Sequence, residues 1–348
     1  MYTNFFVPSN ICLLEIILSR SFVRILPLSS GLVLQIEEIY HFFKYCSLYL
    51  RMCIFCSTFA NVITLSKKMK VGLVLEGGGM RGLYTAGVLD VMMEQHFIPD
   101  VVCGTSAGVT FGVNLLSQQR GRVLRYNCRY VGERRYISMH SWLTTGNMIN
   151  KDFAYGLLPR ELDSFDEETF EQSKAEFYAT ITNMRTGKAE YVRITDTWAQ
   201  MDVIRASASL PIICQPVEWQ GEKYLDGGLA DNIPLDKCLE LGCDKVIIVL
   251  TRLMDYVRND HIAPLCRLAF PRHKALLRTI EQRNDQYNAR IQQIRELEKQ
   301  GKVFVIRPSE DRAVGRLEKD PEKLKALHAL GMQDATEQWP LLLEYLKE

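Results

Sequence analysis

The sequence has almost no net charge and few histidines. Its 348 residues carry 42 basic and 41 acidic side chains, which gives a formal net charge of +1, and only six histidines. A protein dedicated to binding nucleic acid usually shows a basic surplus, so this balance argues against nucleic acid as a partner. The length suits one large domain or two small ones, with enough apolar material for a core.

A disulfide framework is also missing. The ten cysteines show no regular spacing, and a chain of this length needs no disulfides to fold, so we expect mostly reduced thiols and a cytoplasmic location. Cys53 and Cys56 form one C-x-x-C pair, but no second pair or nearby histidine completes a zinc set. We therefore expect no metal site.

Residues 1–68 differ in composition from the rest of the chain. They contain one glycine, no aspartate and four of the ten cysteines, and their longest uncharged run, 52–66, has 15 residues. A spanning helix needs about 20 apolar residues, so this run is too short. We interpret 1–68 as an N-terminal extension without a catalytic part, with Met69 as the true start. The alternative is a leader that associates with membranes.

Residues 70–108 contain one pattern twice: an apolar run, a glycine-rich turn and a helical stretch. The first run, 71–75, leads into Gly77, Gly78 and Gly79, and the second, 101–103, leads into Gly-Thr-Ser-Ala-Gly at 104–108. Short apolar runs bounded by glycine are typical of strands buried on both faces of a parallel sheet. Two such turns side by side would place backbone N–H groups beside a serine hydroxyl, as acyl transfer requires.

The later chain continues to alternate strands and helices. We predict helices over 83–95, 109–116, 201–210, 235–241, 276–299 and 321–347, strands over 175–182, 190–195, 245–250 and 303–306, and covering helices and loops over 120–173. This order predicts an α/β fold whose mainly parallel sheet has helices on both faces. We place a catalytic core at 69–252 and a C-terminal helical extension packed on it at 253–348.

Ser106 is the candidate nucleophile. It lies in Gly-x-Ser-x-Gly, directly after a predicted strand and before a predicted helix. A nucleophile elbow needs this placement, because the sharp turn exposes the hydroxyl while Gly104 and Gly108 carry no side chains that would clash. The N-terminus of the following helix also favours negative charge as it develops.

The six residues from Gly77 to Gly82 match Gly-x-Gly-x-x-Gly, the spacing of a dinucleotide-binding turn. A dinucleotide site needs an acidic residue at the end of the second strand, whereas Asp100 precedes that strand. A phosphate-binding loop needs a Gly-Lys-Ser/Thr sequence, which does not follow. The alternative is an oxyanion hole built from the N–H groups of Gly78, Gly79 and their neighbours.

The proton acceptor for Ser106 has two kinds of candidate. An α/β-hydrolase uses a histidine that follows the serine in the chain, but none of the histidines at 140, 261, 273 and 328 lies in a turn-rich context after a short strand. Asp226 is the better candidate, because Gly227 and Gly228 form a tight turn whose N–H groups can hold its carboxylate. An aspartate is a weak base at its ordinary pKa of about 3.9, so it must be oriented and shielded from water.

Four ordered motifs resemble the patatin-like phospholipases over about 70–250: Gly-Gly-Gly-Met-Arg-Gly, Gly-Thr-Ser-Ala-Gly, the segment from Arg205 to Pro211, and Asp-Gly-Gly at 226–228. The resemblance implies a three-layer α/β/α sandwich and a Ser106–Asp226 dyad without a catalytic histidine. It further implies an oxyanion hole at Gly77, Gly78, Gly79, Met80 and Arg81, and a scaffold at 206–211. Gly82, Gly104, Gly108, Gly227 and Gly228 complete the motifs. Arg81 occupies the family's basic position and faces either a phosphate head group or an internal partner.

We therefore expect a serine lipid acyl hydrolase that cleaves carboxylic esters without a metal or an organic cofactor. The expected partner is a lipid or acyl-ester substrate, with peripheral membrane contact, and the sequence leaves the oligomeric state open. Two alternatives remain: an esterase or thioesterase of the Ser-Asp-His type, and a lipid-binding protein without enzymatic activity on the same fold.

Overall fold

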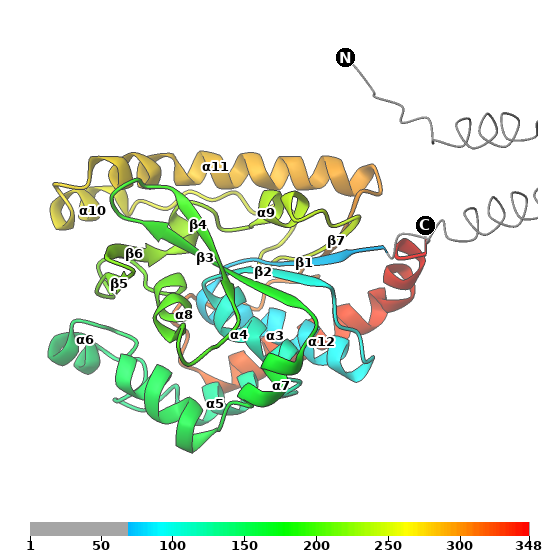
Figure 1. Cartoon of the computed structure of the whole chain (residues 1–348), viewed down its shortest axis with the longest axis horizontal. Coiled ribbons are helices and arrows are strands. Elements are labelled where there is room, and N and C mark those ends of the chain that lie inside the picture. Colours follow the sequence, from blue (N-terminus) through cyan, green and yellow to red (C-terminus); the bar gives the residue numbers. More distant parts are fainter. Residues whose placement is uncertain (1–68, 348) are drawn as a thin grey trace, which may run out of the picture. The chain divides into compact units, whose positions relative to one another are not determined.

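The computed structural model describes residues 69–347, and these residues are built around one mixed sheet (Figure 1). The predictions made for residues 1–68 lie outside the described part. The sheet has eight strands in the order β5-β6-β3-β2-β1-β7-β8, with β4 paired to β3. The strands are β1 (Val71–Leu75), β2 (Val101–Thr105), β3 (Glu176–Asn183), β4 (Ala189–Ile194), β5 (Val217–Trp219), β6 (Glu222–Asp226), β7 (Lys245–Val249) and β8 (Val303–Ile306).

Five neighbouring strands, β3, β2, β1, β7 and β8, are parallel to one another. Strands β4, β5 and β6 form antiparallel pairs on the β3 side of the sheet. Strand β1 lies in the middle and is apolar because both of its faces are covered. Leu73 and Leu75 pack into one core cluster, while Val74 packs into another on the opposite face. This alternation is what the period of two along a strand requires.

Helices cover both faces of the sheet (Figure 1). One layer holds α3 (Gly82–Glu94), α4 (Ala107–Leu116), α5 (Arg122–Tyr130), α7 (Glu167–Gln172) and α12 (Pro321–Tyr345). The other holds α9 (Leu235–Glu240) and α11 (Lys274–Lys299), with α10 (Ala263–Ala269) at the end of α11. The predicted three-layer α/β/α class is therefore confirmed. The domain limits at 68/69 and 252/253 stay predictions.

Shorter elements lie around the carboxyl ends of the strands. They are η1 (Gly79–Arg81), α6 (Met139–Thr145), the π-helix η2 (Phe153–Leu162), α8 (Met201–Ser207) and η3 (Gly227–Leu229). Helix α8 ends three residues before the predicted limit at 210. The reason is a contact with β6: the N–H of Asp226 donates to the carbonyl of Ser209 at 2.8 Å, so the chain has already left the helix there.

None of the helices between residues 69 and 347 combines the length and the apolar character needed to cross a membrane. The six cysteines in this part of the chain are all unpaired thiols.

Candidate active site

The sheet register brings the two candidate catalytic residues together across β3. Thr105, the last residue of β2, pairs with Thr180, and the next residue of β3, Ile181, pairs with Asp226 at the end of β6. Ser106 follows Thr105 directly. Ser106 and Asp226 therefore lie on opposite sides of β3 at the same position along that strand, although 120 positions separate them in the sequence.

Ser106 has an unusual backbone conformation that lifts its side chain out of the turn. Its φ is 55° and its ψ is −116°, a region that non-glycine residues rarely adopt and that marks functional sites. The turn depends on the two flanking glycines. A Cβ on Gly108 would lie 2.5 Å from the carbonyl oxygen of Leu75, and one on Gly104 would lie 2.8 Å from the backbone of Gly108. The buried Ser207 hydroxyl accepts the N–H of Ser106 at 2.9 Å and helps to hold this conformation.

Ser106 and Asp226 form a direct hydrogen bond. The Ser106 Oγ donates to the Asp226 Oδ2 at 2.6 Å, and the N–H of Gly228 donates to the other oxygen, Oδ1, at 2.7 Å. Asp226 is only 2% exposed. Burial raises the pKa of Asp226 above its ordinary value, and the two hydrogen bonds, together with the guanidinium charges of Arg316 and Arg283, counteract part of that rise. The carboxylate is thus oriented and shielded, as a base in this position must be.

The first glycine turn lies against Ser106, but not all of its N–H groups are free. The N–H of Gly77 donates to the carbonyl of Asn232 at 3.2 Å, and the N–H of Met80 donates to the carbonyl of Arg316 at 3.0 Å. These two predicted oxyanion donors are therefore bonded elsewhere in this structure. Gly78 and Gly79 donate no backbone hydrogen bond to any described residue, and both line the cavity at Ser106.

The side chain of Arg81 points away from the dyad. It is 8% exposed and lines a separate cavity with Arg252 and Tyr256, and its Nε has no hydrogen-bond partner among the described residues. Burial, followed by the charges of Arg252 and Arg316, lowers the pKa of Arg81 to about 10. The remaining motif glycine of this turn, Gly82, packs η1 against the start of α4, because a Cβ there would lie 2.8 Å from that of Ala107.

Two cavities meet at Ser106. One, of about 130 Å³, is mostly apolar and extends under α5 and η2; its apolar lining includes Phe111, Tyr126, Tyr155, Leu158 and Ile204. The other, of about 250 Å³, contains Asp226, Gly77, Gly78 and Gly79 on one side, Ile262 and Leu265 near α10 on another, and the cationic side chains of Arg283 and Arg316. Arg316 and Leu317 line both. Both cavities are lined mostly by apolar side chains, and each also contains two arginines: Arg122 and Arg316 in the first, Arg283 and Arg316 in the second.

The histidines considered as bases lie elsewhere. His328 is buried between α12 and α3, where its Nε2 contacts the Asp90 Oδ2 at 2.8 Å. His140 is exposed beside Arg134, and His273 precedes α11. Of the histidines in the described part of the chain, none lines either cavity at Ser106.

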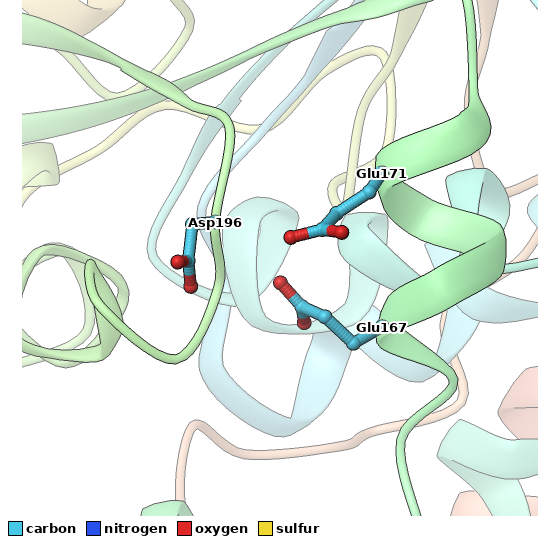
Figure 2. A group of neighbouring side chains, drawn as sticks. All are labelled: Glu167, Glu171 and Asp196. Carbon is cyan, nitrogen blue, oxygen red and sulfur yellow. The ribbon is translucent and has the colours of Figure 1, made fainter.

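A group of three carboxylates lies apart from this site. Glu167 and Glu171 extend from α7 toward Asp196, and Figure 2 shows the three side chains converging. Their oxygens lie within 4.8 Å of one another, but Glu167 already accepts hydrogen bonds from the N–H and hydroxyl of Thr197. None of the three lines the cavities at Ser106. The group therefore adds nothing to the chemistry at Ser106.

Sequence reasoning missed several groups at the site. The N–H of Ala107, directly after the serine, begins α4 and donates no backbone hydrogen bond to a described residue, which fits an oxyanion donor. The position of Ala107 directly after Ser106 could have indicated this donor from the sequence. Arg283 and Arg316 lie far along the chain in segments without any catalytic pattern, so no local signal identifies them.

Comparison with known proteins finds a family match over the part of the chain that contains Ser106 and Asp226. A family model described as patatin-like phospholipase matches residues 73–239, and one described as a domain of unknown function, DUF6363, matches residues 273–347. The uncharacterized protein YjjU of Escherichia coli strain K12 is 27% identical over 248 residues, which cover 65% of this chain and 68% of that protein.

A lysophospholipase of Aspergillus niger, nte1, is 31% identical over 184 residues, or 51% of this chain. The chain spans only 12% of that relative's length. Among solved structures, VipD from Legionella pneumophila is 14% identical and aligns with a TM-score of 0.38 over 78% of this chain and 66% of that one.

Proposed function

The domain at residues 73–239 belongs to the patatin-like phospholipase family, a family of hydrolases that act on lipid esters, and we propose that the protein is a serine lipid acyl hydrolase with a Ser106–Asp226 dyad. The observation that carries this proposal is the 2.6 Å hydrogen bond from the Ser106 hydroxyl to a buried carboxylate, at the junction of two mostly apolar cavities.

The reaction follows from these positions. As the Ser106 oxygen bonds to the ester carbonyl carbon, its proton passes to Asp226, and the carbonyl oxygen becomes an anion. We assign the stabilisation of that anion to the N–H groups of Gly78, Gly79 and Ala107; one such donor contributes on the order of 3 kcal/mol to the transition state. Asp226 returns the proton to the leaving alcohol as the ester C–O bond breaks. Water then attacks the acyl-enzyme, gives its proton to Asp226 and releases the acid, and Ser106 recovers its proton.

The cavities favour a substrate with a long acyl chain. The apolar cavity under α5 and η2 suits the hydrocarbon, and burying each methylene group there stabilises binding by about 0.8 kcal/mol. The absence of a histidine from both cavities, among the described residues, favours the dyad over an esterase of the Ser-Asp-His type.

Replacing Ser106 by alanine tests the proposal. We expect Ser106→Ala to abolish hydrolysis of p-nitrophenyl esters and labelling by a fluorophosphonate probe, while the protein stays folded. The matched control is Ser117→Ala, a buried serine on the far end of α4 that lines neither cavity. Labelling of Ser106 is the decisive result: a folded wild-type protein that the probe does not label at Ser106 favours a lipid-binding protein without activity.

Exposed apolar side chains at the cavity rim support peripheral contact with a membrane. Leu265, which lines the cavity that contains Asp226, and Leu268 lie on α10 and are 58% and 82% exposed. On α6, Leu143 is 74% exposed, and α6 is held to the same rim because Trp142 donates its indole N–H to the carbonyl of Ile212 at 3.1 Å. Both helices lie toward one side of Figure 1.

Vesicle sedimentation tests this contact. Leu268→Asp should weaken binding to phospholipid vesicles, because it places a charge where an apolar side chain would enter the lipid interface. Leu341→Asp on α12, where the leucine is 57% exposed, is the matched control and should bind as the wild type does. Equal binding by both variants would remove α10 from the membrane-contacting surface.

A further inference from the structure

The C-terminal segment, residues 273–347, is the part of the chain that matches a domain of unknown function. It contains α11, β8 and α12, and β8 extends the central sheet by pairing with β7. Two of its residues, Tyr287 of α11 and Arg316 of the loop between β8 and α12, bond to the residues directly before and after the glycines at 77–79. The segment therefore reaches the candidate active site as well as the sheet.

The first contact is a buried hydrogen bond to the residue before the glycines. The Tyr287 hydroxyl donates to Glu76 Oε1 at 2.8 Å, and the two residues are 4% and 1% exposed. Burial and the negative charge of Glu76 raise the pKa of Tyr287, so the hydroxyl keeps its proton and remains the donor. Asn232 Nδ2 donates to the same oxygen at 3.1 Å and to the carbonyl of Gly77 at 3.1 Å. Tyr287 thus helps to fix an oxygen whose other donor holds the first glycine.

The second contact holds the residue after the glycines. The N–H of Met80 donates to the carbonyl of Arg316 at 3.0 Å. Gly79, at φ 59°, lies so close to that carbonyl that a Cβ would be 2.5 Å from its oxygen. The loop that carries Arg316 is anchored to α12, because the N–H and hydroxyl of Ser309 donate to Asp334 at 3.0 and 2.7 Å. The C-terminal segment therefore holds both ends of the glycine turn.

The middle of the turn remains open toward the reacting groups. Gly78 and Gly79 donate no backbone hydrogen bond to a described residue, and both line the cavity that contains Ser106 and Asp226. N–H groups stabilise an oxyanion best when they are already in place before the charge develops. A displacement of about 1 Å in a catalytic geometry can lower a rate about 10²-fold. The contacts that fix the two ends of the turn therefore bear on the reaction.

We propose that the C-terminal segment positions the glycine turn for catalysis, and that Tyr287 is a positioning residue that acts through Glu76. This inference rests on the proposed function, because it takes the N–H groups of Gly78 and Gly79 as oxyanion donors. It gives the segment a role in the reaction in addition to its share of the sheet and of the helical layers. Tyr287 itself lines neither cavity at Ser106, so its effect on the reaction is indirect.

Tyr287→Phe tests the proposal, because it removes the hydroxyl and keeps the ring. The ring packs against Tyr256, with centroids 6.0 Å apart, and lies 3.8 Å from the Arg258 guanidinium. Phenylalanine can make both contacts, so we expect the variant to fold. Tyr287→Phe should lower kcat for p-nitrophenyl butyrate, and the rate of fluorophosphonate labelling, about tenfold. KM should change little, since the oxyanion contact is made in the transition state.

Tyr345→Phe is the matched control. Tyr345 belongs to the same segment and is also buried, and its hydroxyl accepts the N–H of Val246 and donates to the carbonyl of Lys302, both at 3.0 Å. Val246 pairs with Gly72 near the start of β1, at the opposite end of that strand from the glycine turn. Both variants should lower the midpoint of urea unfolding, but Tyr345→Phe should leave kcat and labelling unchanged. Wild-type kcat in Tyr287→Phe, or equal losses of kcat in the two variants, would overturn the positioning role.

Amide hydrogen exchange separates the positioning of the turn from the chemistry. Exchange in the peptide that spans 76–82 is measured by mass spectrometry on the full-length protein, without substrate. It should be about tenfold faster in Tyr287→Phe, the change expected for the loss of one buried hydrogen bond, and unchanged in Tyr345→Phe. Unchanged exchange in Tyr287→Phe would overturn the coupling. If the wild type neither hydrolyses esters nor reacts with the fluorophosphonate while this exchange responds as expected, the proposed hydrolase function fails and the coupling to the turn stands.

Discussion

Replacing Gly331 by alanine should force apart two helices that touch backbone to backbone. Helix α12 crosses α3 at two glycines: a Cβ on Gly331 would lie 2.1 Å from the carbonyl oxygen of Tyr84, and a Cβ on Gly87 would lie 2.1 Å from that of His328. A comfortable contact begins near 3.4 Å. The obstacle is backbone rather than a movable side chain, so the helices must separate by more than an ångström.

The cost of this separation has two parts. Overpacking of a core typically costs about 1–3 kcal/mol. The same helices are joined by two buried hydrogen bonds, from the Tyr84 hydroxyl to Asp334 at 2.9 Å and between His328 and Asp90 at 2.8 Å. Leaving a buried polar group without its partner costs about 1–3 kcal/mol, while alanine gains about 1 kcal/mol in helix propensity over glycine. We expect Gly331→Ala to lower the free energy of unfolding by about 1–5 kcal/mol.

Urea unfolding monitored by circular dichroism measures the effect. Gly156→Ala is the matched control, because Gly156 also lies in a helical segment but a Cβ there would meet no atom within 4 Å. That variant should be as stable as the wild type or up to about 1 kcal/mol more stable. If Gly331→Ala behaves like Gly156→Ala, the argument from close helix approach is wrong.

Three further predictions concern the reacting groups. Asp226→Asn should lower kcat about 10²–10⁴-fold. Burial raises the pKa of Asp226 in the folded state, so its protonated carboxyl stabilises the fold below the pKa of the unfolded chain, and this stabilisation is lost as the pH rises through the folded-state pKa. Between acidic and neutral pH, the wild type should therefore lose more free energy of unfolding than Asp226→Asn, as denaturant unfolding at the two pH values would show. Ser207→Ala leaves the N–H of Ser106 without its acceptor and should cost about 1–3 kcal/mol in urea unfolding, whereas an unchanged midpoint would contradict a supporting role for Ser207. Gly108→Ala places a Cβ 2.5 Å from the carbonyl of Leu75 and should prevent fluorophosphonate labelling; full labelling would refute the steric account of the turn.

The sequence predicted the parts of the fold whose signal is local. The runs at 71–75, 101–103 and 245–250 are apolar because both sheet faces are covered, and they form β1, β2 and β7. The glycine turns were recognisable from the sequence, because only glycine fits where another part of the backbone lies too close for a Cβ. The pairing of β5 with β6 was missed, since a strand of three residues shows too little alternation to be distinguished from a turn.

The composition of the site was less predictable than its location. Ser106 and Asp226 were predicted from their own turns, and in the structure their side chains form a hydrogen bond. Whether an N–H of the glycine turn is free depends on distant partners. Arg316 binds Met80 from more than two hundred residues away, and Asn232 binds Gly77. Such contacts leave no trace in local spacing, so the sequence could not indicate that the N–H groups of Gly77 and Met80 bond elsewhere in the chain. The oxyanion role of the five residues stays a prediction.

Two buried carboxylates, Glu76 before the glycines at 77–79 and Asp226 before those at 227–228, differ in the hydrogen bonds that they accept. Glu76, directly before the glycines, is 1% exposed and accepts from the N–H and hydroxyl of Thr251, from Asn232 at 3.1 Å and from the Tyr287 hydroxyl at 2.8 Å. Its donors occupy both oxygens from three separate segments, so Glu76 fixes the turn and has no free position for another proton. Asp226 has a single fixed donor, Gly228, and its second oxygen faces only Ser106. This difference supports the proposal that Asp226, and not Glu76, receives the serine proton, because the second oxygen of Asp226 is left open toward Ser106.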